Sequence, residues 1–274
     1  MLKINHVSKT FNIGTINEKK ALMGVSLHLN KGDFVTIIGG NGAGKSTLMN
    51  AITGVWPVDN GSIYLDGVNI TGLKEHKRAK YIGRVFQDPM MGTAPDMQIV
   101  ENLALAYRRG KSRTLRWGTT SAEKAMFREK LSTLGLGLED RMTTKVGLLS
   151  GGQRQALTLL MASLRTPKLL LLDEPTKGMD ALFKRELGEK IRSLVKGGMT
   201  VVAVSHDSEF CAEYCDECAF ICDGICSKPC PSGDFFSDNF FYTTEANKIS
   251  RHIFENAVTE TEVLALCRKN QNGR

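Results

Sequence analysis

Apolar positions along the chain fall into short runs separated by polar turns and by helical patterns. The run FVTII, residues 34–38, lies between Lys31-Gly32-Asp33 and Gly39-Gly40, which is typical of a buried strand. Other strand-like runs cover residues 2–7, 25–29, 82–86, 169–172 and 200–204. Helical patterns cover residues 45–54 and 181–195. Because strands alternate with helices, the pattern predicts an α/β fold whose mainly parallel sheet is covered on both faces.

The pattern changes in three places. Residues 61–70 are typical of a hairpin that turns at Asp66-Gly67. Residues 88–164 are mostly helical in pattern, with loops expected at 110–118 and 135–137. After Pro229 the sequence becomes aromatic and irregular, and then helical. We therefore divide the chain into a core of residues 1–88 and 165–230, an inserted helical subdomain of residues 89–164, and a C-terminal extension of residues 231–274.

Composition narrows the class of protein only slightly. The 274 residues are 42% hydrophobic and 24% charged, as in ordinary globular proteins. No apolar run approaches the roughly 18 residues needed to span a bilayer, and the start MLKINHVSKTF lacks the apolar region of a secretory signal. We expect a cytosolic protein with no direct membrane insertion. The net charge of +7 favours anionic partners, although the densest basic stretch, residues 107–117, is more typical of a solvated loop than of a partner contact.

The stretch GGNGAGKST fits the phosphate-binding pattern G-x-x-x-x-G-K-[ST] and lies between a predicted strand and a predicted helix. Its glycines let backbone N–H groups approach phosphate oxygens, and the helix adds the positive end of its dipole. Lys45 can reach the β- and γ-phosphates, and Ser46 offers a hydroxyl to Mg²⁺. The predicted loop comprises Gly39, Gly40, Asn41, Gly42, Ala43, Gly44, Lys45, Ser46 and Thr47.

The stretch LLLLDEP supplies the carboxylates that such a loop needs. Asp173 and Glu174 end an apolar strand, and ligands gather at that end of the strands in open α/β sheets. We expect Asp173 to hold Mg²⁺ through water and Glu174 to orient and polarise the attacking water. Catalysis would then consist of positioning and charge stabilisation.

The stretch LLSGGQRQALTL predicts a second anion site. Ser150, Gly151 and Gly152 are expected to cap a helix whose N-terminus offers free N–H donors. Because the chain already has one phosphate-binding loop, we infer that the second one serves a nucleotide bound to another subunit.

Together these motifs resemble those of the ATP-binding cassette (ABC) ATPases, and the resemblance covers nearly the whole chain. It implies a P-loop NTPase fold with a RecA-like core, an antiparallel β subdomain and an inserted helical subdomain. ATP and Mg²⁺ are the implied cofactors. The resemblance also implies a dimer, of this chain or with a similar ATPase, in which ATP lies between one subunit's P-loop and the other's signature.

Single residues take their roles from the same resemblance. Phe11 matches the aromatic residue that stacks on adenine, and Gln87 matches the glutamine that reaches the metal and the reacting centre. His206 matches the residue that contacts the γ-phosphate. The signature is Ser150-Gly151-Gly152-Gln153, and the D-loop, residues 177–180, ends in Asp180.

A separate transmembrane permease is the implied partner, which places the ATPase at the cytoplasmic face of a bacterial membrane. Trp56 and the methionines after Gln87 suit an apolar contact with a permease, and equally suit packing inside the helical subdomain. Residues 1–166 resemble ATPases of importers fed by a lipoprotein receptor, of the amino-acid or nucleoside type. Residues 168–274 resemble energy-coupling factor ATPases. A natural recombinant and an engineered chimera would both explain this, and both branches are importers.

Two other functions are open. The first is a non-transport ABC ATPase acting on a ribosome or on nucleic acid. Such proteins usually carry two cassettes or a long coiled-coil insertion, and neither pattern is present, so no nucleic-acid partner is expected. The second is a metal or iron–sulfur protein, because six of the seven cysteines lie in residues 210–230.

The expected structure around the cysteines disfavours a metal site. On a predicted strand of residues 217–222, Cys218 and Cys222 lie about 13 Å apart at ~3.3 Å per residue, whereas Zn–S bonds are about 2.3 Å long. Cys226, beyond a turn at Asp223-Gly224, points to the other face. Cys211 and Cys215, four apart on a predicted helix, could share a ligand. We interpret the cysteines as buried or half-buried thiols, with zinc or cluster binding as the alternative.

Overall fold

The computed structural model describes residues 1–111, 118–239 and 242–272. Its central sheet has the strand order β10-β9-β3-β8-β7-β6, and β11 pairs with β9. Strands β3, β6, β7, β8 and β9 run parallel to one another, whereas β10 and β11 run antiparallel to β9. The bounds are β3 (Phe34–Ile38), β6 (Ile82–Val85), β7 (Leu169–Asp173), β8 (Thr200–Val204), β9 (Glu217–Cys222), β10 (Ile225–Cys226) and β11 (Cys230–Pro231). The predicted α/β fold with a mainly parallel sheet is confirmed.

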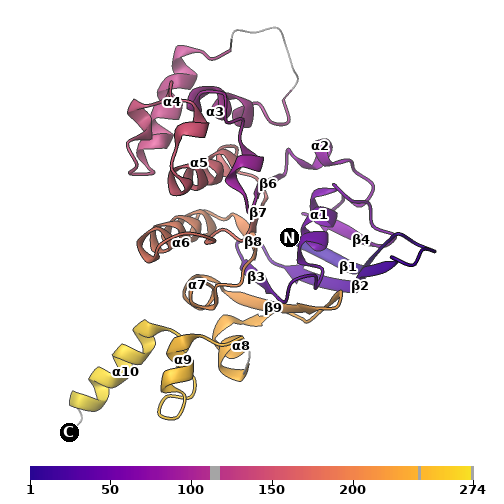
Figure 1. Ribbon diagram of the computed structural model, residues 1–274, viewed down its shortest axis with the longest axis vertical. Helices are drawn as coiled ribbons and strands as arrows, with labels where there is room; N and C mark the ends of the chain where they lie inside the picture. The colour runs from indigo at the N-terminus through magenta and orange to yellow at the C-terminus, as the bar shows by residue number, and fades with distance from the viewer. Residues whose placement is uncertain (112–117, 240–241, 273–274) are drawn as a thin grey trace.

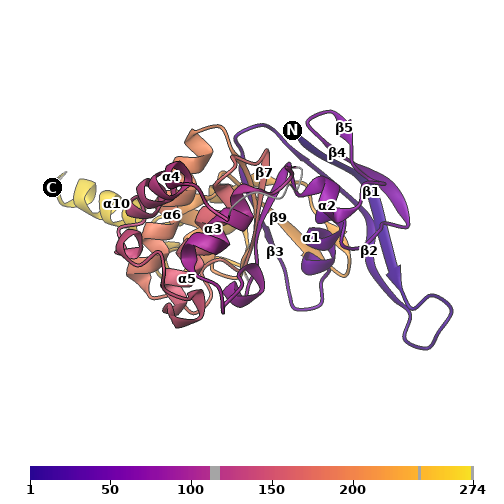
Figure 2. The same ribbon diagram turned by 90° about the horizontal axis from the view of Figure 1, so that it is seen from above.

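The central strands are buried because they contribute side chains to two cores. Val35 and Ile37 of β3 pack in one core with helix α1 (Lys45–Thr53). Phe34 and Ile38 pack in the other with helices α6 (Ala181–Lys196) and α7 (Ser208–Tyr214). Since successive strand residues point to opposite faces, a strand covered on both faces must be apolar throughout. Figure 2 shows α1 on one side of the central strands and α6 on the other.

An antiparallel sheet of order β2-β1-β4-β5 closes the first core over α1. Its strands are β1 (Leu2–Phe11), β2 (Lys19–Leu29), β4 (Asn60–Leu65) and β5 (Val68–Asn69). Asp66 and Gly67 both have positive φ, of 54° and 79°, as a two-residue hairpin turn requires. The predicted hairpin is therefore confirmed, whereas β1 and β2 are longer than the apolar runs that predicted them.

The helical block has an apolar core of its own, drawn from residues 99–160. Its elements are η1 (Pro89–Gly92), α3 (Ile99–Tyr107), α4 (Ser121–Ser132), η2 (Leu138–Asp140), η3 (Val146–Leu148) and α5 (Gly151–Ser163), and the short α2 (Glu75–Arg78) precedes them. Figure 1 shows this block at one end of the molecule, with the C-terminal helices at the other. Most of the loop expected at 110–118, and residues 112–117 of the basic stretch, lie outside the described residues.

The C-terminal segment is helical at its end, as predicted, and also at residues 232–238, where we expected irregular structure. It contains α8 (Ser232–Asp238), α9 (Glu245–Ser250) and α10 (Glu260–Asn272). The expectation fails for residues 232–238 because Phe235 and Phe236 pack edge to face and are buried in the second core. Burial of two aromatic side chains outweighs a weak local preference.

The cysteine-rich segment has the predicted architecture. Helix α7 begins after its cap Asp207, and Cys222 pairs with Ile225 across the Asp223-Gly224 turn. Burial holds the pKa of the Cys215 and Cys218 thiols well above their usual range and raises the pKa of Cys226 to about 11. Cys211 is also buried, and Cys230 is half-buried. The interpretation is wrong for Cys222, which is exposed at the last position of β9, next to the Asp223-Gly224 turn.

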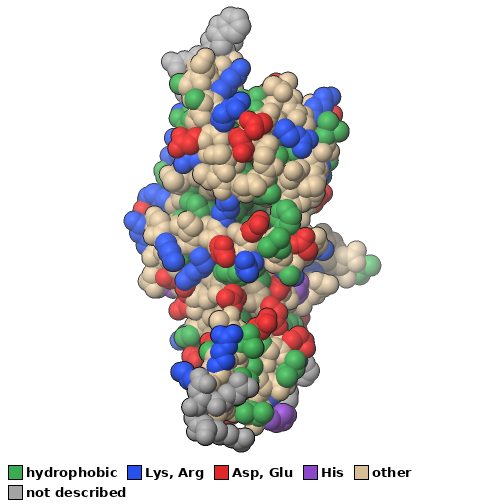
Figure 3. All heavy atoms as spheres, turned by 90° about the vertical axis from the view of Figure 1, so that its left-hand side faces the viewer, with side chains coloured by type: hydrophobic (Ala, Val, Ile, Leu, Met, Phe, Trp, Pro, Cys, Tyr) green, Lys and Arg blue, Asp and Glu red, His purple; other side chains and the backbone are tan. Residues whose placement is uncertain are grey.

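Two further observations concern the surface. In the described part of the chain, every helix is too short or too polar to cross a bilayer. On the face shown in Figure 3, Lys and Arg side chains alternate with Asp and Glu side chains. The net charge of +7 is therefore not gathered into one basic area on this face.

Candidate nucleotide-binding site

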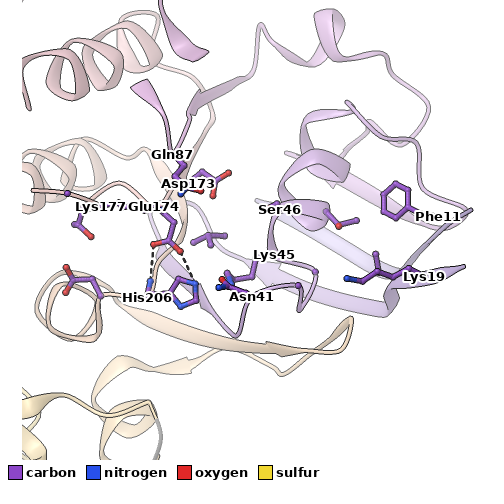
Figure 4. A pocket seen from close by; sticks show the side chains of 18 of the residues that line it. Phe11, Lys19, Asn41, Lys45, Ser46, Gln87, Asp173, Glu174, Lys177 and His206 are labelled. Atoms are coloured by element: carbon purple, nitrogen blue, oxygen red, sulfur yellow. Dashed lines mark hydrogen bonds and ion pairs between the residues drawn. The ribbon is translucent and has the colours of Figure 1, made fainter. Parts of the chain in front are cut away.

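A cavity of about 720 Å³ opens where the C-terminal ends of β3, β7 and β8 face the β1–β2 hairpin. Figure 4 shows side chains from these elements pointing into it. The predicted site residues that line it are Phe11, Asn41, Gly42, Gly44, Lys45, Ser46, Thr47, Gln87, Asp173, Glu174 and His206. Gly39, Gly40 and Ala43 complete the loop from β3 to α1.

The loop before α1 has the shape that its glycines were predicted to permit. Gly42 and Gly44 have φ of 78° and 112°, and a Cβ on Gly44 would lie 2.5 Å from the carbonyl oxygen of Ala21. Helix α1 begins at Lys45 with no side-chain cap. Its first backbone N–H groups therefore remain available to an anion in the cavity.

Lys45 is folded back onto this loop. Its Nζ donates hydrogen bonds to the carbonyl oxygens of Gly39 and Gly40, at 2.7 and 2.8 Å. Burial lowers the pKa of Lys45, although the carboxylates of Glu174 and Asp173 oppose this effect. The ammonium is therefore held at the base of the cavity, within reach of phosphate oxygens that enter the loop.

Glu174 and His206 form a pair on the opposite wall. His206 Nε2 lies 3.3 Å from Glu174 Oε1, and the His206 backbone N–H donates to Glu174 Oε2 at 3.2 Å. The Glu174 side chain is 13% exposed, and its backbone has a φ of 47°. Burial raises the pKa of this carboxyl, while His206 and Lys45 hold it down in part. A carboxylate with a raised pKa is a stronger proton acceptor, which suits a group that polarises water.

Asp173 is held by a residue that the sequence did not single out. Arg84 of β6 places Nη2 3.7 Å from Asp173 Oδ2, and its Nη1 donates to Asn50 Oδ1 of α1 at 2.7 Å. The guanidinium also lies over the ring of Phe86, 4.6 Å from its centroid. A charged residue within the apolar run IGRVF was the available signal for this role.

The oxygen donors fit a magnesium ion. The Ser46 hydroxyl, the Gln87 amide and the Asp173 carboxylate line the same cavity. Hard oxygen donors of these kinds, completed by water and by substrate phosphates, are those that Mg²⁺ prefers. In the described chain no group of three or more His, Cys, Asp and Glu side chains could hold a metal ion, so any such ion depends on these mixed donors.

The predicted signature residues lie outside the cavity lining. Ser150 Oγ accepts from the backbone N–H of Gln153, and the Gln153 side chain accepts from the Ser150 N–H, which together cap α5. A Cβ on Gly152 would lie 2.9 Å from the ring of Phe183. Asp180 caps α6 by accepting from the backbone N–H of Phe183 at 2.9 Å. The remaining signature residue, Gly151, is exposed at the start of α5.

Other cavity residues were not predicted as site residues. They are Lys19, Ala21, Thr176, Lys184, Val204 and Asp207, whereas Lys177 and Gly178, which also line the cavity, belong to the predicted D-loop. Lys184 forms an ion pair with Asp207 at 2.6 Å. Phe11, which was predicted, meets the ring of Trp56 edge to face with centroids 4.9 Å apart. Trp56 is half-buried against Phe11 of β1, outside the helical subdomain, whereas Met90 and Met91 are exposed by 39% and 70%.

Comparison with known families decides what this arrangement is. The family model described as ABC transporter matches residues 22–177, which include the loop, Gln87, the signature and both acids. The chain belongs to the ABC transporter ATPases. The order and spacing of motifs predicted this membership, and the chain has the α/β architecture of ABC cassettes.

Named relatives agree with this membership. The chain is 40% identical over 221 residues to the tyrosine transport ATP-binding protein of Clostridioides difficile, covering 79% of this chain and 86% of that protein. It is 33% identical over 212 residues to the phosphonates import ATP-binding protein PhnC 2 of Nostoc, covering 76% and 84%. An ABC transporter ATP-binding protein of Bacillus thuringiensis is 34% identical over 267 residues, which is 97% of this chain. This chain spans only 46% of that relative's length.

A solved structure shows the same fold. The ATP-binding cassette MJ0796, in a dimeric post-hydrolysis state bound to ADP and Pi, superposes with a TM-score of 0.74 at 27% identity. The match covers 85% of this chain and 99% of that one. This ABC ATPase therefore has the fold of a cassette that hydrolyses ATP.

Proposed function

We propose that this chain is the ATP-hydrolysing subunit of an ABC importer, which dimerises around two ATP molecules and drives solute uptake through a separate permease at the cytoplasmic face of the membrane. The observation that carries the proposal is the division of the motifs. One cavity brings together the P-loop, Asp173, Glu174 and His206, while the signature lies outside it.

Hydrolysis follows from the groups around the cavity. Lys45 exchanges the carbonyl oxygens of Gly39 and Gly40 for phosphate oxygens, because a charged acceptor forms the stronger hydrogen bond. Glu174, held by His206, accepts a hydrogen bond from the water that attacks the γ-phosphorus. The bond between phosphorus and the departing ADP oxygen breaks as the new bond forms. Magnesium, held through Ser46, Gln87 and Asp173, would supply charge neutralisation between the phosphates.

The dimer explains the position of the signature. Gly151 begins α5 at the surface, so its helix N-terminus is free to meet an anion from outside the chain. A second ABC ATPase subunit would bring its own nucleotide to this point. The dimeric state named for MJ0796 supports such an arrangement.

The direction of transport is inferred from relatives and from the surface after Gln87. PhnC 2 is named as an import protein and the Clostridioides protein as a tyrosine transport protein. Exposed Met90 and Met91 offer an apolar contact for a permease. The resemblance of residues 1–166 and 168–274 to two importer branches remains a prediction. Affinity capture with the full chain, followed by identification of the permease, tests the importer assignment and shows which importer branch the permease belongs to. Recovery of ribosomes in place of a permease would contradict the proposal.

Replacing Glu174 tests the hydrolytic role. We expect Glu174→Gln to reduce ATP turnover by at least about 100-fold, because the base is lost while the site's shape is kept. ATP should then hold the variant as a dimer on a sizing column. Glu189→Gln, which changes an exposed glutamate on α6, is the matched control and should behave as the wild type. Undiminished turnover in Glu174→Gln would show that another group orients the water.

A further inference from the structure

A lysine at the mouth of the cavity is not explained by any motif. Lys19 begins β2, and the β1–β2 register places it directly opposite Phe11. Both side chains line the cavity. The last pair of this hairpin therefore presents an aromatic ring and an ammonium to the same space (Figure 4).

The ammonium of Lys19 is turned toward the P-loop. In Figure 4 its nitrogen lies on the side of the cavity where the P-loop passes, and a Cβ built on Gly42 would lie 3.5 Å from Lys19 Nζ. Gly42 belongs to the loop whose backbone N–H groups are free for phosphate. The lysine and the loop therefore face the same part of the cavity from two sides.

Like Lys177, and unlike Lys45 and Lys184, Lys19 lines the cavity without a side-chain partner among the described residues. Lys45 donates to two carbonyl oxygens, and Lys184 is paired with Asp207. Within residues 1–111, 118–239 and 242–272, Lys19 Nζ has neither a hydrogen bond nor an ion pair. An unpaired cation beside an anion-binding loop gains a favourable interaction when an anion binds there.

We propose that Lys19 is a nucleotide-binding residue that contacts the phosphate chain between the base, which lies on Phe11, and the P-loop. The proposal rests on the proposed function, because it requires that the cavity take a nucleotide. It assigns to β2 a role in holding the nucleotide, in addition to Phe11 of β1. Lys19 is an exposed group, so its contribution is that of an ion pair at the surface, which salt screens.

Binding of ADP and AMP to the full chain, measured by calorimetry at low and at high salt, tests this role. Lys19→Met keeps the aliphatic stem and removes the charge. We expect this change to weaken the binding of both nucleotides by about three- to tenfold at low salt, with a smaller loss of affinity at high salt. Lys19→Arg should restore most of the affinity. Lys20→Met is the matched control, because Lys20 points to the opposite face of the same strand and should leave affinity unchanged.

The outcomes separate the two proposals. Equal affinity of Lys19→Met and wild type for ADP would overturn the role of Lys19 while leaving the nucleotide site intact. A loss of equal size at low and high salt, which Lys19→Arg does not restore, would show that the side chain acts through packing and would also overturn it. Absence of nucleotide binding by the wild type would refute the proposed function itself.

Discussion

The P-loop and the signature loop, both of which we propose to bind phosphate, are built differently. The P-loop begins α1 inside a cavity, faced by Lys45, two carboxylates and a histidine. The signature loop begins α5 at the surface, and its polar groups are used mainly in capping the helix. Both present a helix N-terminus, but the charged groups that we expect to position metal and water surround only the first.

This difference teaches which steps need one subunit and which need two. A single chain has what is required to bind a nucleotide, because the loop, Lys45 and the metal donors share one cavity. We expect the signature to act only on a nucleotide brought to the surface by another subunit. Binding and hydrolysis should therefore respond differently to changes in the two loops.

Lys45→Ala tests the first loop and should have the largest effect. Loss of a charge-assisted bond to phosphate is expected to weaken ATP binding by about 100-fold. The α1 helix should still form, since alanine is the best helix former. A fluorescent-ATP titration measures the affinity, with circular dichroism as the folding control. Binding equal to that of the wild type would mean that the two loops differ less than their surroundings indicate.

Arg84→Met tests whether the first site is anchored in the core. The Arg84 and Asp173 side chains are 14% and 13% exposed, and the change leaves Asp173 and Asn50 without this partner. We expect the free energy of unfolding to fall by about 2 kcal/mol. Urea unfolding measures it. Arg128→Met, which breaks the exposed pair with Asp140, is the control and should change stability by less than about 0.5 kcal/mol. Similar losses in both variants would contradict the anchoring role.

Ser150→Ala tests the second loop. Removal of the hydroxyl that caps α5 should cost about 1 kcal/mol of stability. ADP binding by the single chain should stay unchanged, whereas ATP turnover should fall because the partner's nucleotide loses a contact. Calorimetry and a phosphate-release assay measure the two. The contrast between the loops would be lost if this variant bound ADP as weakly as Lys45→Ala.

The pH dependence of stability should show the smallest effect. Burial raises the pKa of Glu174, so the folded protein holds this proton more tightly than the unfolded chain does. Glu174 therefore adds to the free energy of unfolding at low pH. This contribution is lost as the pH rises from about 4.3 through the raised pKa. Glu174→Gln should remove this part of the slope. Urea unfolding from pH 4 to pH 7 tests it, and an unchanged slope would contradict the burial effect.

Much of the fold was predictable because local pattern and global position agree. The run of residues 34–38 is apolar throughout, since it contributes to two cores. The Asp66-Gly67 turn needs positive φ at both positions, which these residues adopt readily. The helix at residues 232–238 was missed because the burial of Phe235 and Phe236 is set by residues distant in sequence.

The site was predictable as motifs but not as contacts. The order of the P-loop, acids and signature indicated which residues matter. Lys19 and Arg84 were missed because their roles come from the register of paired strands, which no short pattern records. The end of β9 at Cys222 was predicted, but the exposure of this thiol was not, because it depends on what packs against the end of the strand.

The closeness of Gly152 to Phe183 has a mechanical consequence. The first turn of α5 rests directly on the ring that follows the Asp180 cap of α6, and there is no space for even one more carbon between them. Glycine at position 152 therefore lets the starts of α5 and α6 pack in direct contact through this ring. A displacement of α5 toward α6 would therefore first have to move the Phe183 ring beside the Asp180 cap.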